Sequence, residues 1–159
     1  MKIHPETQIG HVHLHVGDLD RAIKFYRDIL GFDVVTMYGD SAAFLSAGGY
    51  HHHIGLNTWA GKDATPPPAG HTGLYHFAIL LPNRKELAKV LKNLIDHKYP
   101  IQGASDHGVS EAIYLSDPDE NGIELYVDRP RDNWPKDAQG NLAMTSLPLD
   151  LDKLLAEAE

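Results

Sequence analysis

The 159-residue sequence contains no cysteine, and this absence excludes disulfides, thiolate-bound zinc, iron–sulfur clusters and a thiol nucleophile. Any metal ligands must therefore come from histidine, aspartate or glutamate. No apolar run approaches the roughly 20 residues of a membrane-spanning helix, and residues 1–10 lack the apolar core of a signal peptide. We expect a cytoplasmic protein with no membrane partner.

Basic side chains are also scarce, with 14 Lys and Arg against 22 Asp and Glu and a formal net charge of -8. Nucleic-acid binding normally leaves a basic footprint, so this balance argues against a nucleic-acid partner. Histidine, in contrast, is abundant at 11 residues. Seven of the histidines are crowded into three short stretches: His11, His13, His15, His51, His52, His53 and His76.

The chain contains an internal repeat. An offset of 65 positions places residues 12–18 on residues 77–83 and His11 on His76. Each of these strand-like stretches is followed by a helical pattern with a capping side chain, Asp18 or Asp20 in the first copy and Asn83 in the second. Three strand candidates follow each helix: 32–37, 41–47 and 50–57 in the first copy, and 100–103, 110–115 and 122–127 in the second.

Both copies therefore predict the order β-α-β-β-β. We predict one α+β domain in which two βαβββ modules form an incomplete barrel around a metal cleft. The proline-rich segment between the copies is the expected linker, and the residues after the second copy form a tail that ends in a short amphipathic helix. The expected bounds are 7–60 for module one, 61–71 for the linker, 72–130 for module two and 131–159 for the tail.

Alternation along a strand points His11, His13 and His15 to one face, opposite to the aliphatic residues between them. In the last strand of the second copy, Glu124 lies on the face opposite to its apolar neighbours. If the modules are related by a pseudo-twofold axis, His11, His76 and Glu124 converge. A slip of the strand register would put His13 or His15 in the place of His11.

Two histidines and one carboxylate form the ligand set of many Fe(II) oxygenases, which leaves positions open for substrate and O₂. The same donors suit Mn(II), Zn(II) and Ni(II), so the ligand set alone does not fix the metal. We expect Fe(II) first and these three ions as alternatives.

Residues 10–32, which read GHVHLHVGDLDRAIKFYRDILGF, resemble the opening of a vicinal oxygen chelate module, as found in glyoxalases, bleomycin-resistance proteins and extradiol dioxygenases. Residues 117–125 resemble the closing motif of such a module. This resemblance implies that His11, His76 and Glu124 are metal ligands. Glyoxalase I proteins have a fourth ligand, a glutamate in the closing strand of the first module. Alignment of residues 54–56 on 123–125 puts Gly55 at that position, so three ligands remain.

Extradiol ring-cleavage dioxygenases have three such ligands, and the resemblance to them extends to Tyr114, to His107 and to one of His51–His53 as catalytic groups. His52 is the best positional match, and a shift of one residue selects His53. Strand alternation would send His52 to the face opposite to His51 and His53. Residues 48–61 and 72–82 resemble modules of Bacillus-type catechol 2,3-dioxygenases, which usually carry four modules where this chain has two.

These observations predict an Fe(II)- or Mn(II)-dependent extradiol dioxygenase that acts on a catechol-like aromatic substrate with O₂. Two alternatives stay open: a glyoxalase-like lyase, isomerase or thiol transferase that uses Ni, Zn or Mn, and a non-catalytic protein that binds a small molecule or drug in the same cleft. We expect a homodimer, because two short modules leave sheet edges that a second subunit can cover.

Overall fold

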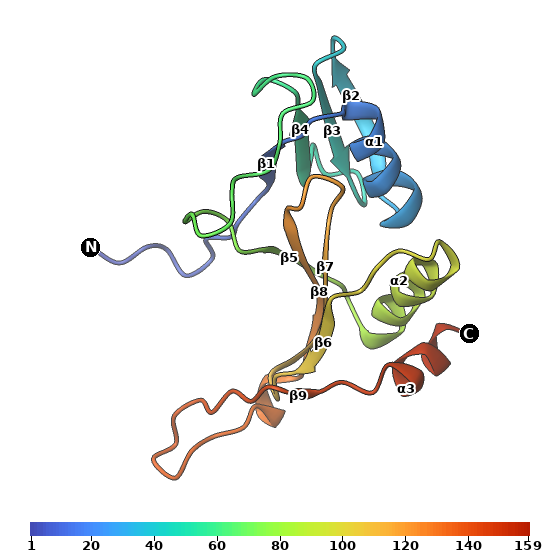
Figure 1. Ribbon diagram of the computed structural model, residues 1–159. Helices are drawn as coiled ribbons and strands as arrows, with labels where there is room; N and C mark the ends of the chain where they lie inside the picture. The colour runs from blue at the N-terminus through green and yellow to red at the C-terminus, as the bar shows by residue number, and fades with distance from the viewer. The chain divides into compact units, whose positions relative to one another are not determined.

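The computed structural model describes residues 1–159, and their contacts divide into two compact units, Met1–Thr65 and Pro66–Glu159. The division falls within the predicted linker segment. Each unit has its own sheet, four-stranded in the first and five-stranded in the second, accompanied by helices (Figure 1). The predicted α+β class is confirmed, and the two sheets are not closed into a barrel.

The first unit has the predicted βαβββ order. Its sheet order is β1-β4-β3-β2, with β1 parallel to β4 and the other neighbours antiparallel. The elements are β1 (Val12–His15), α1 (Leu19–Lys24), the π-helical turn η1 (Phe25–Ile29), β2 (Asp33–Tyr38), β3 (Ala42–Ser46) and β4 (Ile54–Asn57).

Helix α1 starts after Asp18, one of the two predicted capping residues. The Asp18 side chain accepts a hydrogen bond from the backbone N–H of Arg21, which caps the helix N-terminus. The helical segment ends at Gly31, whose φ of 86° suits glycine. The helix contacts β3 and β4, and Leu14 of β1 and Val16, which directly follows β1, are buried. The histidines of β1 therefore lie on the opposite, polar face, as alternation predicts.

The second unit repeats the βαβββ order and adds a C-terminal extension. Its sheet order is β5-β8-β7-β6-β9, with β5 parallel to β8. The elements are β5 (Phe77–Leu80), α2 (Arg84–Asp96), β6 (Gly103–Asp106), β7 (Ser110–Ser116), β8 (Gly122–Asp128), the 3-10 turn η2 (Arg131–Asn133), β9 (Leu147–Pro148), α3 (Leu151–Leu155) and the 3-10 turn η3 (Ala156–Ala158).

Helix α2 packs through its apolar stripe. Asn83 caps it by accepting a hydrogen bond from the N–H of Glu86, and Leu87, Leu91 and Leu94 are fully buried. The helix contacts β8 on one side and α3 on another, and Figure 1 shows α2 and α3 side by side. The fully buried Leu154 anchors α3, so the predicted C-terminal helix is confirmed. No helix combines the length and the apolar character that crossing a bilayer requires.

Two predicted strands were placed wrongly. The strand expected over 50–57 begins only at Ile54, because the Gly48-Gly49 turn is followed by a loop that contains His51–His53. The alternation argument for these three histidines is therefore wrong. The strand expected over 100–103 begins at Gly103, where pairing with Tyr114 of β7 starts. The partner strand sets this register, and a single strand's own sequence does not contain it.

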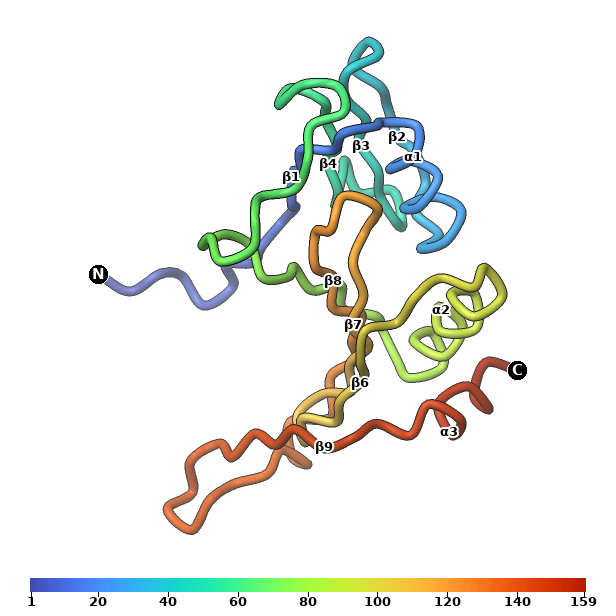
Figure 2. The backbone as a smooth tube through the Cα atoms, viewed as in Figure 1, coloured from blue at the N-terminus to red at the C-terminus, as the bar shows by residue number.

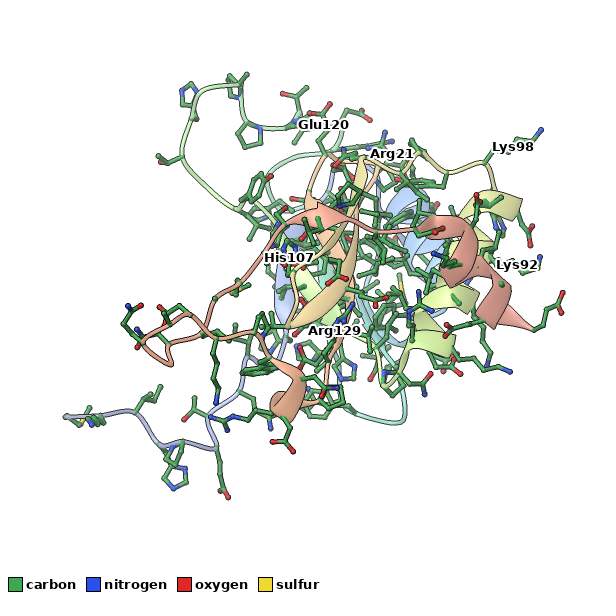
Figure 3. All side chains as sticks on the ribbon, turned by 90° about the horizontal axis from the view of Figure 1, so that it is seen from below. Arg21, Lys92, Lys98, His107, Glu120 and Arg129 are labelled. Carbon is green, nitrogen blue, oxygen red and sulfur yellow. The ribbon has the colours of Figure 1, made fainter.

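Two turns of the second unit are built alike. In the β7–β8 turn, labelled by Glu120 in Figure 3, the Asp117 carboxylate accepts hydrogen bonds from two backbone N–H groups and from the Asn121 side chain. Asp137 does the same in the turn that ends at Asn141, and the backbone hydrogen bonds at these two turns match. These N–H donors lower the pKa of Asp137. The fourth position of each turn has a positive φ.

This comparison predicts a stabilising substitution. The fourth position is Glu120 with φ 65° in one turn and Gly140 with φ 82° in the other. We expect Glu120→Gly to raise the free energy of unfolding by about 0.5–1 kcal/mol, because glycine removes the strain of the left-handed conformation but gains entropy in the unfolded chain. Urea unfolding measures the difference. Glu120→Ala removes the same charge and keeps the strain, so a glycine variant no more stable than the alanine variant would contradict this account.

Candidate metal centre and catalytic groups

Two of the three predicted metal ligands lie together in the second unit. His76 immediately precedes β5, Glu124 lies in the parallel neighbour β8, and their Nε2 and Oε2 atoms are 3.0 Å apart. The main-chain segments that carry the two residues lie very close together, since a Cβ at Gly122 would collide with the carbonyl oxygen of Tyr75. The Glu124 side chain is only 14% exposed, so its carboxylate needs a hydrogen-bonding or metal partner.

The geometry of this pair fits a shared metal ion. Two donors that each lie about 2.1 Å from one ion, at right angles to each other, are about 3.0 Å apart. The observed separation of His76 and Glu124 is therefore compatible with ligation. The third predicted ligand, His11, belongs to the first unit, and no group of three or more His or acidic side chains forms a metal-binding cluster in the structure. The set of three stays a prediction.

Glu124 is the end of a hydrogen-bonded chain that includes both other predicted catalytic groups of this unit. The Tyr114 hydroxyl on β7 lies 3.1 Å from Oε1 of Glu124 and 2.7 Å from Nε2 of His107. The other ring nitrogen of His107, Nδ1, is 2.8 Å from the carbonyl oxygen of Thr145. Burial, followed by the charge and hydrogen bond of Glu124, raises the pKa of Tyr114 to about 12.

Counting protons along this chain shows what it can do. A carbonyl only accepts, so Nδ1 of His107 carries a hydrogen toward Thr145, and an ionised Glu124 also only accepts. With a neutral His107, the single Tyr114 proton has two acceptors, Nε2 of His107 and the carboxylate. If Nε2 of His107 also carries a proton, it donates to the Tyr114 oxygen and the Tyr114 hydroxyl donates to Glu124, so that each hydrogen bond in the chain has a donor. The chain therefore has one hydrogen-bonding position, at Nε2 of His107, that a further proton would fill.

In the first unit, the rings of His52 and His11 lie against each other. Their ring centroids are 4.3 Å apart, and the His52 ring also lies 5.1 Å from that of Phe44. Burial lowers the pKa of His52, and the neighbouring histidines lower it further. His53 is bound elsewhere, because its Nδ1 lies 3.1 Å from the Ser46 hydroxyl and 3.3 Å from the N–H of Ala47. Of the two predicted candidates, His52 is the one that shares the surroundings of a predicted ligand.

Gly55 occupies the position that corresponds to Glu124, as the sequence alignment predicted. It pairs with His13 in the β1–β4 ladder, and Glu124 pairs with Ala78 in the β5–β8 ladder. The structure adds a reason for the glycine that the sequence analysis missed. A Cβ at Gly55 would lie 2.8 Å from two ring atoms of His13, so the imidazole covers the site where a side chain would start.

At this cross-strand pair, the large residue lies on opposite strands in the two modules. In the first module the large His13 pairs with the small Gly55, and in the second the small Ala78 pairs with the large Glu124. The 65-residue offset already places His13 on Ala78, so this signal was present in the sequence. The His13 ring lies 5.6 Å from Phe44 and 5.4 Å from Trp59. Burial, with the charges of the adjacent histidines, lowers its pKa.

The remaining histidine of β1 has a structural partner. Nδ1 of His15 lies 2.7 Å from Oδ1 of the buried Asn57, which also accepts a hydrogen bond from the N–H of Trp59. His15 therefore ties the ends of β1 and β4 together, and this role disfavours it as a substitute for His11. Thr145 was also missed by the sequence analysis, because it acts through its main-chain groups and no residue pattern marks it.

Comparison with known proteins agrees with this architecture. The family model of the Glyoxalase/Bleomycin resistance protein/Dioxygenase superfamily matches residues 8–125. The catechol-2,3-dioxygenase of Bacillus subtilis is 47% identical over 156 residues, which cover 98% of this chain and 54% of the relative. Biphenyl-2,3-diol 1,2-dioxygenase 3 of Rhodococcus globerulus is 30% identical over 126 residues, which cover 76% of this chain and 63% of the relative.

The chain thus spans between about half and two thirds of the length of these relatives. Among solved structures, a glyoxalase/dioxygenase from Nostoc punctiforme aligns with a TM-score of 0.66 at 20% identity, covering 82% of this chain and 98% of the other. That similarity concerns the fold alone. The match of the family model over residues 8–125 shows that the chain belongs to the glyoxalase, bleomycin resistance protein and dioxygenase superfamily.

Proposed function

We propose that the protein is a metal-dependent extradiol dioxygenase that cleaves the ring of a catechol-like substrate with O₂. The observation that carries the proposal is the chain from His107 through Tyr114 to Glu124 and His76, which joins a proton-accepting group to a ligand pair of suitable spacing. The 47% identical relative is named a catechol-2,3-dioxygenase, which supports the same reaction class.

His11, His76 and Glu124 would hold the metal, for which Fe(II) is our first proposal and Mn(II) our second. When bound, the ion would supply Lewis-acid and redox chemistry for the catechol oxygens and O₂. Both oxygen atoms of O₂ enter the ring-opened product, so the overall reaction needs no external reductant. The homodimer and the cytoplasmic location stay predictions.

The chain's own residues have distinct roles in this proposal. Tyr114 has the position of a hydrogen-bond donor toward an oxyanion beside Glu124, because its hydroxyl already lies 3.1 Å from the carboxylate. His107 orients that hydroxyl and takes up a proton at Nε2. His52, beside His11, is the proposed acceptor of a proton from a catechol hydroxyl, because burial and the neighbouring histidines lower its pKa and so favour the neutral imidazole that can accept a proton.

The direct test is ring cleavage. Protein loaded with Fe(II) under anaerobic conditions, mixed with catechol and then exposed to air, should form a yellow ring-opened product with uptake of one O₂ for each catechol. A panel of substituted catechols extends the test to related substrates. Turnover of a hemithioacetal without any catechol cleavage would overturn the proposal in favour of a glyoxalase-like enzyme. Ligand binding by protein that holds no metal would favour the non-catalytic alternative.

Tyr114→Phe should lower kcat for ring cleavage about 100-fold, because loss of one preorganised donor to a developing oxyanion typically costs 10²–10³-fold. The metal content should stay at the wild-type level, since the phenol is not a ligand. Steady-state kinetics and elemental analysis measure both quantities. Tyr99→Phe is a matched control, because its hydroxyl donates to the carbonyl of Ser116, outside the chain described above. Equal effects of the two substitutions would contradict the role of Tyr114.

A further inference from the structure

The C-terminal extension makes close contact with His107. After β8 the chain leaves the sheet, forms a long excursion and returns beside β6 as β9, a path that Figure 2 shows in orange to red. All of this excursion lies beyond residues 8–125, which the family model matches. The return segment meets the loop between β6 and β7, where His107 is located (Figure 3).

We propose that this excursion, residues 129–148, is a positioning element that fixes the ring and the tautomer of His107. The inference rests on the proposed function, because it assigns a task to the His107 chain. Thr145 forms two main-chain hydrogen bonds with His107. Its N–H donates to the His107 carbonyl at 3.0 Å, and its carbonyl accepts from Nδ1 of the His107 ring at 2.8 Å. These reciprocal bonds leave Nε2 directed at Tyr114.

The excursion is anchored at its start as well as at its return. The N–H of Arg129 donates to the carbonyl of Val109, and its guanidinium pairs with Asp106 and with the buried Glu111. The indole N–H of Trp134 donates to the Arg129 carbonyl at 2.9 Å. Both ends of the excursion therefore attach to the strands that flank His107, which makes the Thr145 contact a fixed feature of the second unit.

Gly108 shows how closely the excursion packs on the His107 loop. A Cβ at Gly108 would lie 2.8 Å from Cγ of Pro135 and 3.2 Å from the hydroxyl of Thr145, so only glycine fits without displacing the excursion. Pro135 and Thr145 come from its outgoing and returning arms, which are joined by a hydrogen bond from the N–H of Ala143 to the Pro135 carbonyl. A side chain at this position would push against both arms.

The consequence is a defined proton position. A neutral imidazole free of a carbonyl partner exchanges between two tautomers, and the choice is set by the bond that the other nitrogen makes. With Nδ1–H committed to Thr145, the lone pair of neutral His107 lies on Nε2, in contact with the Tyr114 hydroxyl. His107 can then accept a proton only on the side of Tyr114 and Glu124.

The test compares two glycine substitutions. Gly108 and Gly140 have similar positive φ values of 74° and 82°, so alanine costs similar backbone strain at both, but a Cβ at Gly140 meets nothing within 4 Å. In the 159-residue chain labelled with ¹⁵N-histidine, with and without Zn(II), the His107 ring of wild type and Gly140→Ala should show one protonated Nδ1 and one unprotonated Nε2 at high pH. Gly108→Ala should show averaged ring signals.

In the Fe(II)-loaded enzyme, Gly108→Ala should lower kcat about tenfold with little change in KM, which is less than the roughly 10²–10⁴-fold contribution of an acid–base group because His107 itself is retained, whereas Gly140→Ala should leave kcat unchanged. If Gly108→Ala does not fold, Thr145→Pro takes its place, because it removes the N–H partner of the His107 carbonyl together with the Thr145 hydroxyl that donates to the Asp106 carbonyl. An Nε2–H tautomer in wild type, or equal behaviour of both alanine variants, would overturn the proposal. Because the NMR readout needs no substrate, it stands even if catechol is not cleaved.

Discussion

Glu124→Ala is expected to abolish stoichiometric metal binding, with an affinity loss of more than about 100-fold, since even partners outside the ligand set contribute 10–100-fold. The substitution removes one proposed ligand and also leaves His76 and Tyr114 without their shared carboxylate partner. Elemental analysis of the purified variant beside wild type measures the loss. Glu120→Ala is the matched control, because it removes the same charge from the exposed turn that precedes β8.

The same measurement tests the third ligand. His11→Ala should lower the metal content as Glu124→Ala does, whereas His15→Ala should not, because His15 is hydrogen-bonded to Asn57 at the end of its strand. If metal persists undiminished in Glu124→Ala, the ligand assignment is wrong. If it persists in His11→Ala and is lost in a His13 variant, the register of the first strand has been misread by two positions.

The repeat made much of the fold predictable. The 65-residue offset relates the first strands of the two modules, and a separate alignment of two short apolar segments, 54–56 and 123–125, gives the correspondence of Gly55 with Glu124. The strand ladders give the same correspondence, with Ile54 opposite Val12 and Ile123 opposite Phe77. Capping residues and apolar stripes located the helices for the same reason, since their signals are local and lie within one element.

The features of the site that the sequence did not predict depend on contacts between distant segments or on the conformation of loops. The orientation of His52 follows from a loop that packs its ring on His11, and strand alternation has no bearing on a loop. Thr145 acts on His107 across 38 positions through peptide groups, which every residue carries. The filling of the Gly55 site by His13 involves two strands that are adjacent in space but separated by the whole module.

The opposite placement of the large residue in the His13–Gly55 and Ala78–Glu124 pairs predicts a second large effect, on the stability of the protein. Gly55→Glu should destabilise the protein by about 1–3 kcal/mol, the typical cost of forcing a side chain into a space that is already filled, here by the His13 ring. The atoms in the way are Cγ and Cδ2 of His13, close to the root of its side chain, so a rotation of the chain end does not relieve the collision.

The double variant His13→Ala/Gly55→Glu should recover most of that loss, because it copies the Ala78–Glu124 pair of the second module. Urea unfolding of the two single variants and the double variant gives the coupling free energy between the positions. An additive result, with no rescue by His13→Ala, would show that the imidazole is not what excludes a side chain at position 55.

The double variant also tests why the first module lacks a carboxylate. In the second module the corresponding Glu124 reaches His76 within 3.0 Å, so an acidic side chain at position 55 should come equally close to His11. A fourth protein ligand would raise the affinity for Zn(II) and Ni(II) and remove an open coordination position, so the proposed dioxygenase activity should fall at least about tenfold while metal content is kept. His13→Ala/Gly55→Ala opens the same space without the carboxylate. If this control loses activity to the same extent, His13 itself contributes to the reaction, and the glycine matters only because it makes room for that imidazole.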